Sequence, residues 1–266
     1  MRGLIIAAIA LPCLYSCEAQ FAEFNDRGVT FGHVHLVVAD IELHQKLWPE
    51  LFDAFLVEKQ GYSAVRVSNA LIFFRDAEPT APSAKTALDH FGLTVRSVGD
   101  VLSKWRALGY EVDSEATDES GLSSAYITMP GGVRLALQEN PNQSESTSMG
   151  HVHFVTPIRD ELMAWYAARF GATASAQGDI VNASNIPGSG LSFEDSETER
   201  LPTSGAAIDH IGFEVQEWDA FIAMLEDHNV EFEFGPAYVE SLDLLVAFFN
   251  DPSGVLVEIT HGLDQF

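Results

Sequence analysis

The chain has 266 residues, of which 47% are hydrophobic and 20% charged, a composition typical of a globular protein with one large or two smaller domains. Its 14 basic and 39 acidic residues give a formal net charge of -25, which repels phosphate backbones and anionic membrane surfaces. Nucleic acid is therefore excluded as an expected partner. Beyond the N-terminal segment no stretch has the roughly 18 consecutive apolar residues of a membrane helix, so no membrane span is predicted.

The first 19 residues differ from the rest of the chain. Arg2 is followed by an apolar run from Leu4 to Leu14 and then by small and polar residues as far as Ala19, the three regions of a secretory signal peptide. We therefore predict a signal peptide over residues 1–19 and export to the periplasm or the medium; a buried N-terminal strand is the alternative. The segment ending at Cys17 also resembles a bacterial lipobox, which would instead anchor the protein to lipid through Cys17.

One short strand pattern occurs four times, over residues 32–38, 89–95, 150–156 and 209–215. Each copy carries a histidine at the same place, and the spacings between these histidines are 57, 61 and 59 residues. A repeat of this regularity predicts four copies of one structural unit. The histidines are His33, His90, His151 and His210.

Each repeated strand is followed by a helical apolar pattern and then by further strand-like runs, so each copy reads as a βαβββ module. An acidic residue stands where each helix should begin and is predicted as its N-cap. These residues are Asp40, Asp100, Asp160 and Asp219. A polar segment over residues 140–148 is a linker signal. It predicts two paired halves, an N-terminal pair over 29–140 and a C-terminal pair over 148–262.

The closing strand of each module, aligned on its turn, shows one informative position. That position is Glu258 in the fourth module, and Phe193, Ala136 and Phe73 in the third, second and first. Burying the bare charge of Glu258 between Val257 and Ile259 would cost several kcal/mol, so it should have a cation or a hydrogen-bonding partner. The alternative is that Glu258 lies at a solvated sheet edge while the histidines pack in the core.

Two imidazoles and one carboxylate on one face of a cation form a facial triad, which leaves coordination positions open for substrate or dioxygen. We predict His151, His210 and Glu258 as metal ligands, with Glu258 also as the catalytic residue. His153 shares a strand face with His151 and could replace it. The ligand types accept iron, zinc, manganese or nickel alike, so the predicted cofactor is a divalent metal ion of unspecified identity.

The histidine-bearing first strand, the helix, and the closing Asp251-Pro252 turn with Glu258 resemble the vicinal-oxygen-chelate superfamily over residues 31 to 262. That superfamily includes glyoxalase I, extradiol dioxygenases and bleomycin-resistance proteins. The resemblance implies an α+β fold of four βαβββ modules, paired into two glyoxalase-like half-barrel domains. It also implies that the N-terminal pair, lined by His33, His35 and His90, is metal-free.

Departures from the superfamily pattern bear on the reaction. Extradiol dioxygenases resemble this chain in their ligands, but their conserved tyrosine and second histidine correspond here to Phe248 and Val239. The fourth ligand of glyoxalase I corresponds to Phe193. We therefore expect an exported metal-dependent enzyme with glyoxalase-like lyase or isomerase chemistry on a small oxygenated substrate, with a homodimer as one arrangement. The alternatives are an Fe(II) ring-cleaving dioxygenase and a non-catalytic binding protein.

Overall fold

The computed structural model describes residues 21–177 and 180–265, so the predicted signal peptide lies outside the described residues. Module 1 comprises β1 (Val29–Val38), α1 (Ile41–Phe52), β2 (Phe55–Lys59), β3 (Tyr62–Val67) and β4 (Ala70–Asp76). After the short 3-10 helix η1 (Ser83–Lys85), module 2 comprises β5 (Leu88–Val95), α2 (Val98–Ala107), β6 (Ser114–Thr117), β7 (Ser123–Met129) and β8 (Val133–Glu139). Module 3 comprises β9 (Thr147–Thr156), α3 (Arg159–Phe170), β10 (Thr173–Gln177), β11 (Ile180–Ser184) and β12 (Gly190–Asp195). Module 4 comprises β13 (Ile208–Val215), α4 (Trp218–Asp227), β14 (Phe232–Val239), β15 (Leu244–Asn250) and β16 (Leu256–His261), followed by η2 (Leu263–Gln265).

The four predicted βαβββ modules are confirmed, and each repeated histidine strand is the first strand of its module. Of the predicted N-caps only Asp40 is confirmed, because its side chain accepts a hydrogen bond from the Leu43 amide. The other three acidic residues lie in the first helical turn, where they favour the positive end of the helix dipole. None of the helices in the described residues is long and apolar enough to cross a membrane.

The strands form two eight-stranded sheets, and the pairing of modules differs from the prediction. One sheet runs β14-β15-β16-β13-β1-β4-β3-β2 and joins module 1 to module 4; the other runs β10-β11-β12-β9-β5-β8-β7-β6 and joins module 2 to module 3. We call them the 1–4 sheet and the 2–3 sheet. The predicted N-terminal pair over 29–140 and C-terminal pair over 148–262 are therefore wrong. The α+β class with paired half-barrels holds for both sheets.

The polar segment over residues 140–148 is not a boundary between two pairs. The segment between Glu139 and Thr147 joins β8 to β9, but β9 then pairs antiparallel with β5 inside one sheet. A few residues suffice for this connection, because β8 and β9 flank the same strand, β5. The pairing that is most distant in sequence is that of β1 with β13, for example His33 with Gly212, which joins the first module to the last.

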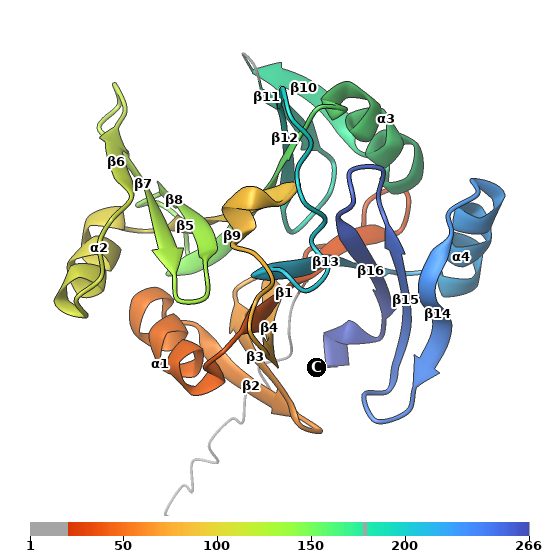
Figure 1. The fold of residues 1–266 in the computed structure, drawn as a ribbon, viewed down its shortest axis with the longest axis horizontal. Coiled ribbons are helices and arrows are strands. Elements are labelled where there is room, and N and C mark those ends of the chain that lie inside the picture. Colours follow the sequence, from red (N-terminus) through yellow and green to blue (C-terminus); the bar gives the residue numbers. More distant parts are fainter. Residues whose placement is uncertain (1–20, 178–179, 266) are drawn as a thin grey trace, which may run out of the picture.

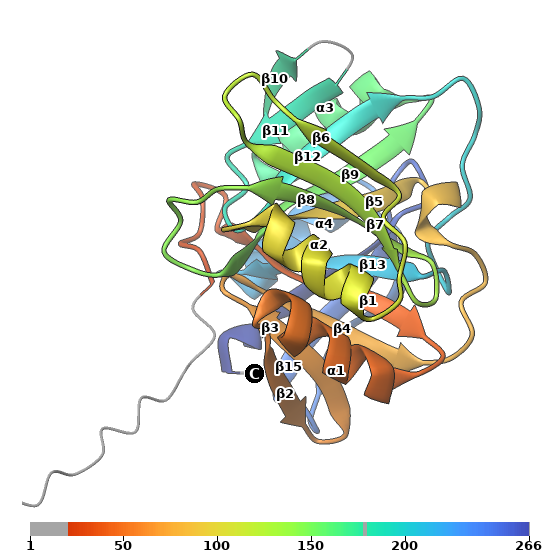
Figure 2. The ribbon, with the colours of Figure 1, turned by 90° about the vertical axis from the view of Figure 1, so that its left-hand side faces the viewer.

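The two sheets share one hydrophobic core on their helix-covered sides (Figure 1). The Trp48 ring of α1 stacks on Phe91 of β5 with 6.2 Å between ring centroids, and α1 lies beside α2 (Figure 2). The Phe170 ring of α3 contacts Phe213 of β13 at 4.6 Å. Aromatic residues from all four modules thus hold the two sheets together, and the opposite face of each sheet lines a cavity.

Paired irregularities in the first strands bring side chains to the cavity faces. In the 1–4 sheet the register shifts at Gly32 and at Asp209; in the 2–3 sheet it shifts at Gly150 and at Asp89. A β-bulge changes which face the following residues occupy. The bulge at Gly32 therefore leaves Phe31 in the core and directs His33 away from it. The same arrangement in both sheets gives the molecule an approximate internal twofold repeat.

Candidate metal centre

Three titratable side chains meet at the base of the cavity in the 1–4 sheet. The carboxylate oxygen Oε2 of Glu258 lies 2.8 Å from His33 Nε2 and 3.0 Å from His210 Nε2. His33, His210 and Glu258 have exposed fractions of 1%, 4% and 9%, so the cluster is shielded from solvent. We call these three residues the first cluster. Because Glu258 is buried on an inner strand of the sheet, the alternative that it lies at a solvated sheet edge is wrong.

The sequence around Glu258 explains its position. In β16 alternate residues point to opposite faces, so Val257 and Ile259 enter the shared core while Glu258 and Thr260 face the cavity. The strand pairs in parallel with β13, and Glu258 lies opposite Gly212, two residues beyond His210. This register brings the carboxylate of one strand to the imidazole of the next.

Two glycines make room for histidine rings at equivalent points of the two sheets. A Cβ atom on Gly212 would overlap the ring of His33, and a Cβ atom on Gly92 would overlap the ring of His151. Neither glycine has a positive φ, so the backbone does not require glycine at either place. Ring space alone explains the missing side chain.

Asp209 orients His210. The bulge at Asp209 lets its carboxylate oxygen Oδ2 lie 2.6 Å from His210 Nδ1, which leaves Nε2 directed toward Glu258. The other oxygen of Asp209 accepts hydrogen bonds from the Gly205 amide at 2.7 Å and from Arg75 at 2.8 Å. A carboxylate on the second nitrogen of a histidine is the usual support of a metal-binding imidazole. Sequence reasoning missed Asp209, although an aspartate precedes the histidine in both module 2 and module 4.

The charges of the first cluster are strongly coupled. Burial raises the pKa of Glu258, but the neighbouring imidazoles of His33 and His210 outweigh it and hold that pKa well below its usual range. Burial lowers the pKa of His210, but hydrogen bonds to Asp209 and Glu258 raise it to about 9. Burial lowers the pKa of His33, which Glu258 offsets only in part. In the metal-free chain Glu258 is therefore an anion stabilised by a protonated His210.

The structure brings together two of the three predicted ligands and places the third elsewhere. His210 and Glu258 lie in the 1–4 sheet, whereas His151 and its alternative His153 both lie on β9 of the 2–3 sheet. The prediction that either completes the site is wrong, because module 4 pairs with module 1 rather than with module 3. His33, which we expected to line a metal-free pocket, occupies the place given to His151.

His151 and His153 belong to a second group of side chains. Together with His90 they form what we call the second cluster, in which one nitrogen of each ring lies within 4.8 Å of the others. Burial is the main cause that lowers the pKa of His151 to about 3, with contributions from His90 and His153. The ring of His151 is therefore neutral.

One closing-strand alignment also needs correction. In module 3 the residue equivalent to Glu258 is Ser192, which pairs with His153, and not Phe193, which lies in the core. A shift of one residue reverses the face of the strand. In the 1–4 sheet the position for a fourth ligand is Phe73 of β4. Its ring lies against that of His33, with 5.2 Å between the ring centroids. That position holds an apolar side chain, as predicted for the fourth-ligand position, but through Phe73 rather than Phe193.

The cavity above the first cluster is small and largely apolar. Its volume is about 280 Å³. Its polar lining is confined to His33, His35, His210, Glu258, Thr260 and the edge residue Tyr62. Its walls come mainly from the last module, with Phe234, Val239, Leu244, Val246 and Phe248 among the lining residues. A ligand bound here would meet polar groups at the base and hydrocarbon at the walls.

The first cluster fits a divalent cation. Its three ligand atoms all lie within 4.8 Å of one another, and the donor set of two imidazole nitrogens and one carboxylate oxygen suits zinc, iron, nickel or manganese. The Nδ1 atom of His33 is buried with no hydrogen-bond partner among the described residues. A cation bound between the three side chains would replace the hydrogen bonds of Glu258 to His33 and His210 with bonds to the metal.

Fold and cluster together define a protein built from two paired-module half-barrels, one of which carries a buried His, His, Glu centre. Residues 148–259 match the family model described as the Glyoxalase/Bleomycin resistance protein/Dioxygenase superfamily. The chain is similar in structure to glyoxalase I from Zea mays, with a TM-score of 0.71 and 14% identity over 89% of this chain and 93% of that one. It is also similar to a Bacillus subtilis protein provisionally assigned as a dioxygenase, with a TM-score of 0.65 and 10% identity over 91% of this chain and 86% of that one.

Among curated proteins, none matches the chain significantly. The C-terminal part of the chain thus matches the model of this superfamily, and the two-sheet fold fits its four-module type. At these identities the structural likeness establishes the fold alone.

Proposed function

We propose that the protein is a metal-dependent enzyme of the vicinal-oxygen-chelate type, which holds a divalent cation through His33, His210 and Glu258. Its substrate would be a small molecule with two neighbouring oxygens and an otherwise apolar body. The observation that carries the proposal is the convergence of two imidazoles on one buried carboxylate at the base of an apolar cavity.

A cation in such a centre supplies Lewis-acid catalysis, polarising a substrate oxygen and lowering the pKa of bound water. The chain's own residues would set up that chemistry. Glu258 contributes the negative charge of the ligand set and His33 and His210 contribute neutral nitrogens. Asp209 fixes the tautomer and orientation of His210 through its contact with Nδ1.

His35 offers a further polar contact to the substrate. It lines the cavity beside His210, with 4.6 Å between ring centroids, and its Nε2 atom has no hydrogen-bond partner among the described residues. A substrate oxygen could therefore form a hydrogen bond with His35 while the apolar walls exclude water. We assign His35 a positioning role.

The cavity favours a compact apolar substrate over a large anionic one. Its lining contains no lysine and no arginine among the described residues, so nothing there would neutralise the carboxylates of glutathione. The cavity volume of about 280 Å³ is just below the usual range for ligand pockets, about 300–1,000 Å³. A small dicarbonyl, hydroxy-acid or phenolic compound would fit these walls.

The lining also favours lyase or isomerase chemistry over ring cleavage. Phe248 pairs with Glu258 on the neighbouring strand, and both Phe248 and Val239 line the cavity. Ring opening requires a proton donor and a base beside the bound oxygen, and neither residue can serve. The apolar walls are also compatible with simple sequestration of a ligand, as expected for a binding protein.

The decisive experiment is metal analysis of anaerobically purified protein and of four single variants, each a histidine or Glu258 changed to alanine. We expect Glu258→Ala, His33→Ala and His210→Ala each to lose the metal of the first cluster. His151→Ala should retain it. If the wild type holds no metal that Glu258→Ala removes, the enzyme proposal fails and a binding protein remains. Oxygen uptake with catechols, followed against product formation from dicarbonyl compounds, then separates an oxygenase from a lyase or isomerase.

We also propose export through the N-terminal segment, with cleavage after Ala19 and lipid attachment at Cys17 as the alternative. The support is the order of a basic residue, an apolar run and small residues in the first 19 positions. N-terminal sequencing of the protein recovered from the periplasm and from membranes tests both. An intact Met1 in a cytoplasmic product contradicts export.

A further inference from the structure

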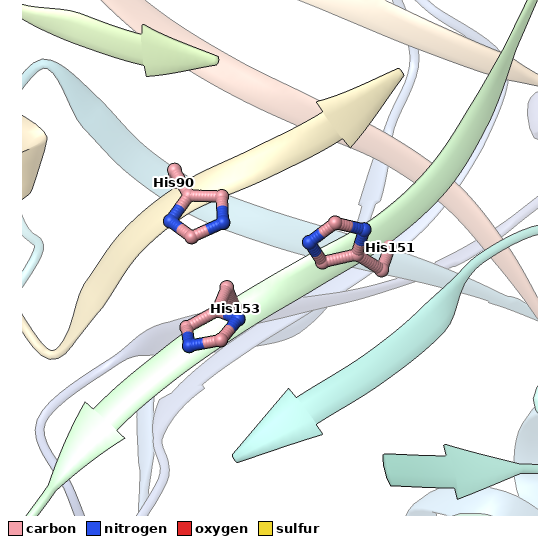
Figure 3. Close-up of side chains that lie close together, drawn as sticks. All are labelled: His90, His151 and His153. Atoms are coloured by element: carbon pink, nitrogen blue, oxygen red, sulfur yellow. The ribbon is translucent and has the colours of Figure 1, made fainter. Parts of the chain in front are cut away.

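We propose that His90, His151 and His153 form a second metal site, in the 2–3 sheet, which binds a borderline-soft divalent cation such as Zn²⁺ through three imidazoles. The rings come from two neighbouring strands, β5 and β9, and converge on one face of that sheet (Figure 3). One nitrogen of each ring lies within 4.8 Å of the others. The His90 ring lies 4.5 Å from that of His153 and 5.5 Å from that of His151, measured between centroids.

Asp89 orients the ring of His90 for metal coordination. His90 is only 3% exposed, and its Nε2 atom is buried without a hydrogen-bond partner among the described residues. Its Nδ1 atom lies 2.8 Å from Asp89, which itself binds Arg134 at 2.6 Å and Arg200 at 2.8 Å. The carboxylate thus fixes the ring in the orientation that metal-binding histidines require, and leaves Nε2 as a free ligand atom.

His153 is also held by a carboxylate, and His151 is held by packing. His153 Nε2 lies 2.9 Å from Glu194 Oε2, so its remaining nitrogen is available to a cation. The ring of His151 occupies the space that a side chain on Gly92 would fill. The unpartnered buried Nε2 atom of His90 is costly in a metal-free protein, because a buried polar atom without a hydrogen bond loses its hydration.

The second site is not a copy of the first. In module 2, which takes the place of module 4 in this sheet, the residue equivalent to Glu258 is Ala136. It pairs with Gly92 as Glu258 pairs with Gly212, so no carboxylate enters the ligand set from that strand. The third ligand is instead His153, at the place that His35 occupies in the other sheet. Three neutral nitrogens favour zinc, copper or nickel over manganese and magnesium, which prefer oxygen ligands.

The surroundings point to a polar ligand for this second centre. The cavity beside it, which His151 and His153 line, has a volume of about 600 Å³ and includes Tyr126, Gln138, Asn182 and Ser192 in its lining. Three protein ligands leave a tetrahedral cation one open position, which is the pattern of catalytic rather than structural zinc. A hydrophilic oxygen ligand would therefore suit the second site, in contrast to the apolar substrate proposed for the first.

The test is titration of the metal-free full chain with Zn²⁺, measured by calorimetry and by competition with a chromophoric chelator. We expect two equivalents in the wild type and one in Glu258→Ala. His151→Ala should weaken Zn²⁺ binding at the second cluster by at least about 100-fold and leave Zn²⁺ affinity at the first cluster unchanged. His228→Ala is the control, because His228 is exposed and its Nδ1 lies 2.7 Å from the Met224 carbonyl oxygen.

A second measurement needs no change in the second cluster. X-ray absorption of Glu258→Ala loaded with one equivalent of Zn²⁺ should report three imidazole ligands. Loss of all tight Zn²⁺ binding in Glu258→Ala, or fewer than three imidazoles around the remaining ion, overturns the proposal. If only the first site fails to bind, the wild type and Glu258→Ala should both bind the same single equivalent of Zn²⁺.

Discussion

Replacing Gly212 by alanine changes one hydrogen into a methyl group beside the first cluster. The strand backbone accepts alanine, because Gly212 lies in β13 without a positive φ. The new Cβ atom, however, would occupy the volume of the His33 ring. Since Gly212 is held on both sides by β1 and β16, the ring rather than the strand should move. We therefore expect Gly212→Ala to displace the His33 ring from the first cluster although His33 itself is unchanged.

The size of the effect follows from the contact that is lost. His33 Nε2 lies 2.8 Å from Glu258 Oε2, and a hydrogen bond to a charged group contributes about 1.5–3 kcal/mol. The alanine returns about 0.4–1 kcal/mol by restricting the unfolded chain. The metal-free variant should thus be destabilised by about 0.5–2.6 kcal/mol. Metal affinity should fall by at least about 100-fold, or about 2.7 kcal/mol, because one of three ligands is gone.

Urea unfolding gives the first quantity, and competitive Zn²⁺ titration referenced to Glu258→Ala gives the second. The matched control is Gly92→Ala, which places the same methyl group against His151 in the other sheet. It should leave the first centre at wild-type affinity. If Gly212→Ala binds the metal of the first centre as tightly as the wild type, or if Gly92→Ala abolishes that binding, His33 is not a ligand and the reasoning from ring space is refuted.

Three further predictions concern the support of the site, its walls and the fold. Asp209→Asn should weaken metal binding by about 10- to 100-fold while His210 stays in place, and unchanged affinity would rule out the orienting role. Phe234→Ala should weaken binding of an apolar ligand by about threefold to tenfold, because Phe234 lines the cavity. The control Phe55→Ala, which changes another exposed phenylalanine that does not line the cavity, should leave binding unchanged. Burial raises the pKa of Asp251 to about 6 despite its hydrogen bonds to Ser253 and Tyr166. The protonated Asp251 carboxyl therefore stabilises the fold fully below about pH 4, and this stabilisation is lost as the pH rises through 6. Relative to the wild type, the free energy of unfolding of Asp251→Asn in urea should rise by up to about 3 kcal/mol between pH 4 and pH 7.5. An equal difference at both pH values would contradict this assignment.

The sequence by itself determined the local structure. The regular spacing of the four histidine strands, the apolar helix pattern after each and the turn before each closing strand depend on neighbours in the chain, and all four modules form as predicted. The prominence of Glu258 was also a local matter, because a carboxylate in an apolar strand needs a partner wherever the strand lies. His210, on the strand beside it within the same module, followed from the same reasoning.

Only the tertiary structure decided which histidine completes the centre. Four similar modules can pair in more than one way, and each first strand offers the same histidine, so nothing within a module selects its partner. The choice is made by contacts between distant strands, namely β1 against β13 and β5 against β9. These contacts bring His33 to Glu258 and leave His151 with His90.

The register of module 3 was also beyond local reasoning. The turn after Pro187 is one residue shorter before its closing strand than the turn after Pro252, as the strand pairing shows. An alignment on proline therefore selected Phe193, on the core face, instead of Ser192, on the cavity face. Sequence periodicity fixes which residues alternate, but only hydrogen bonding to the neighbouring strand fixes which of the two faces reaches the cavity.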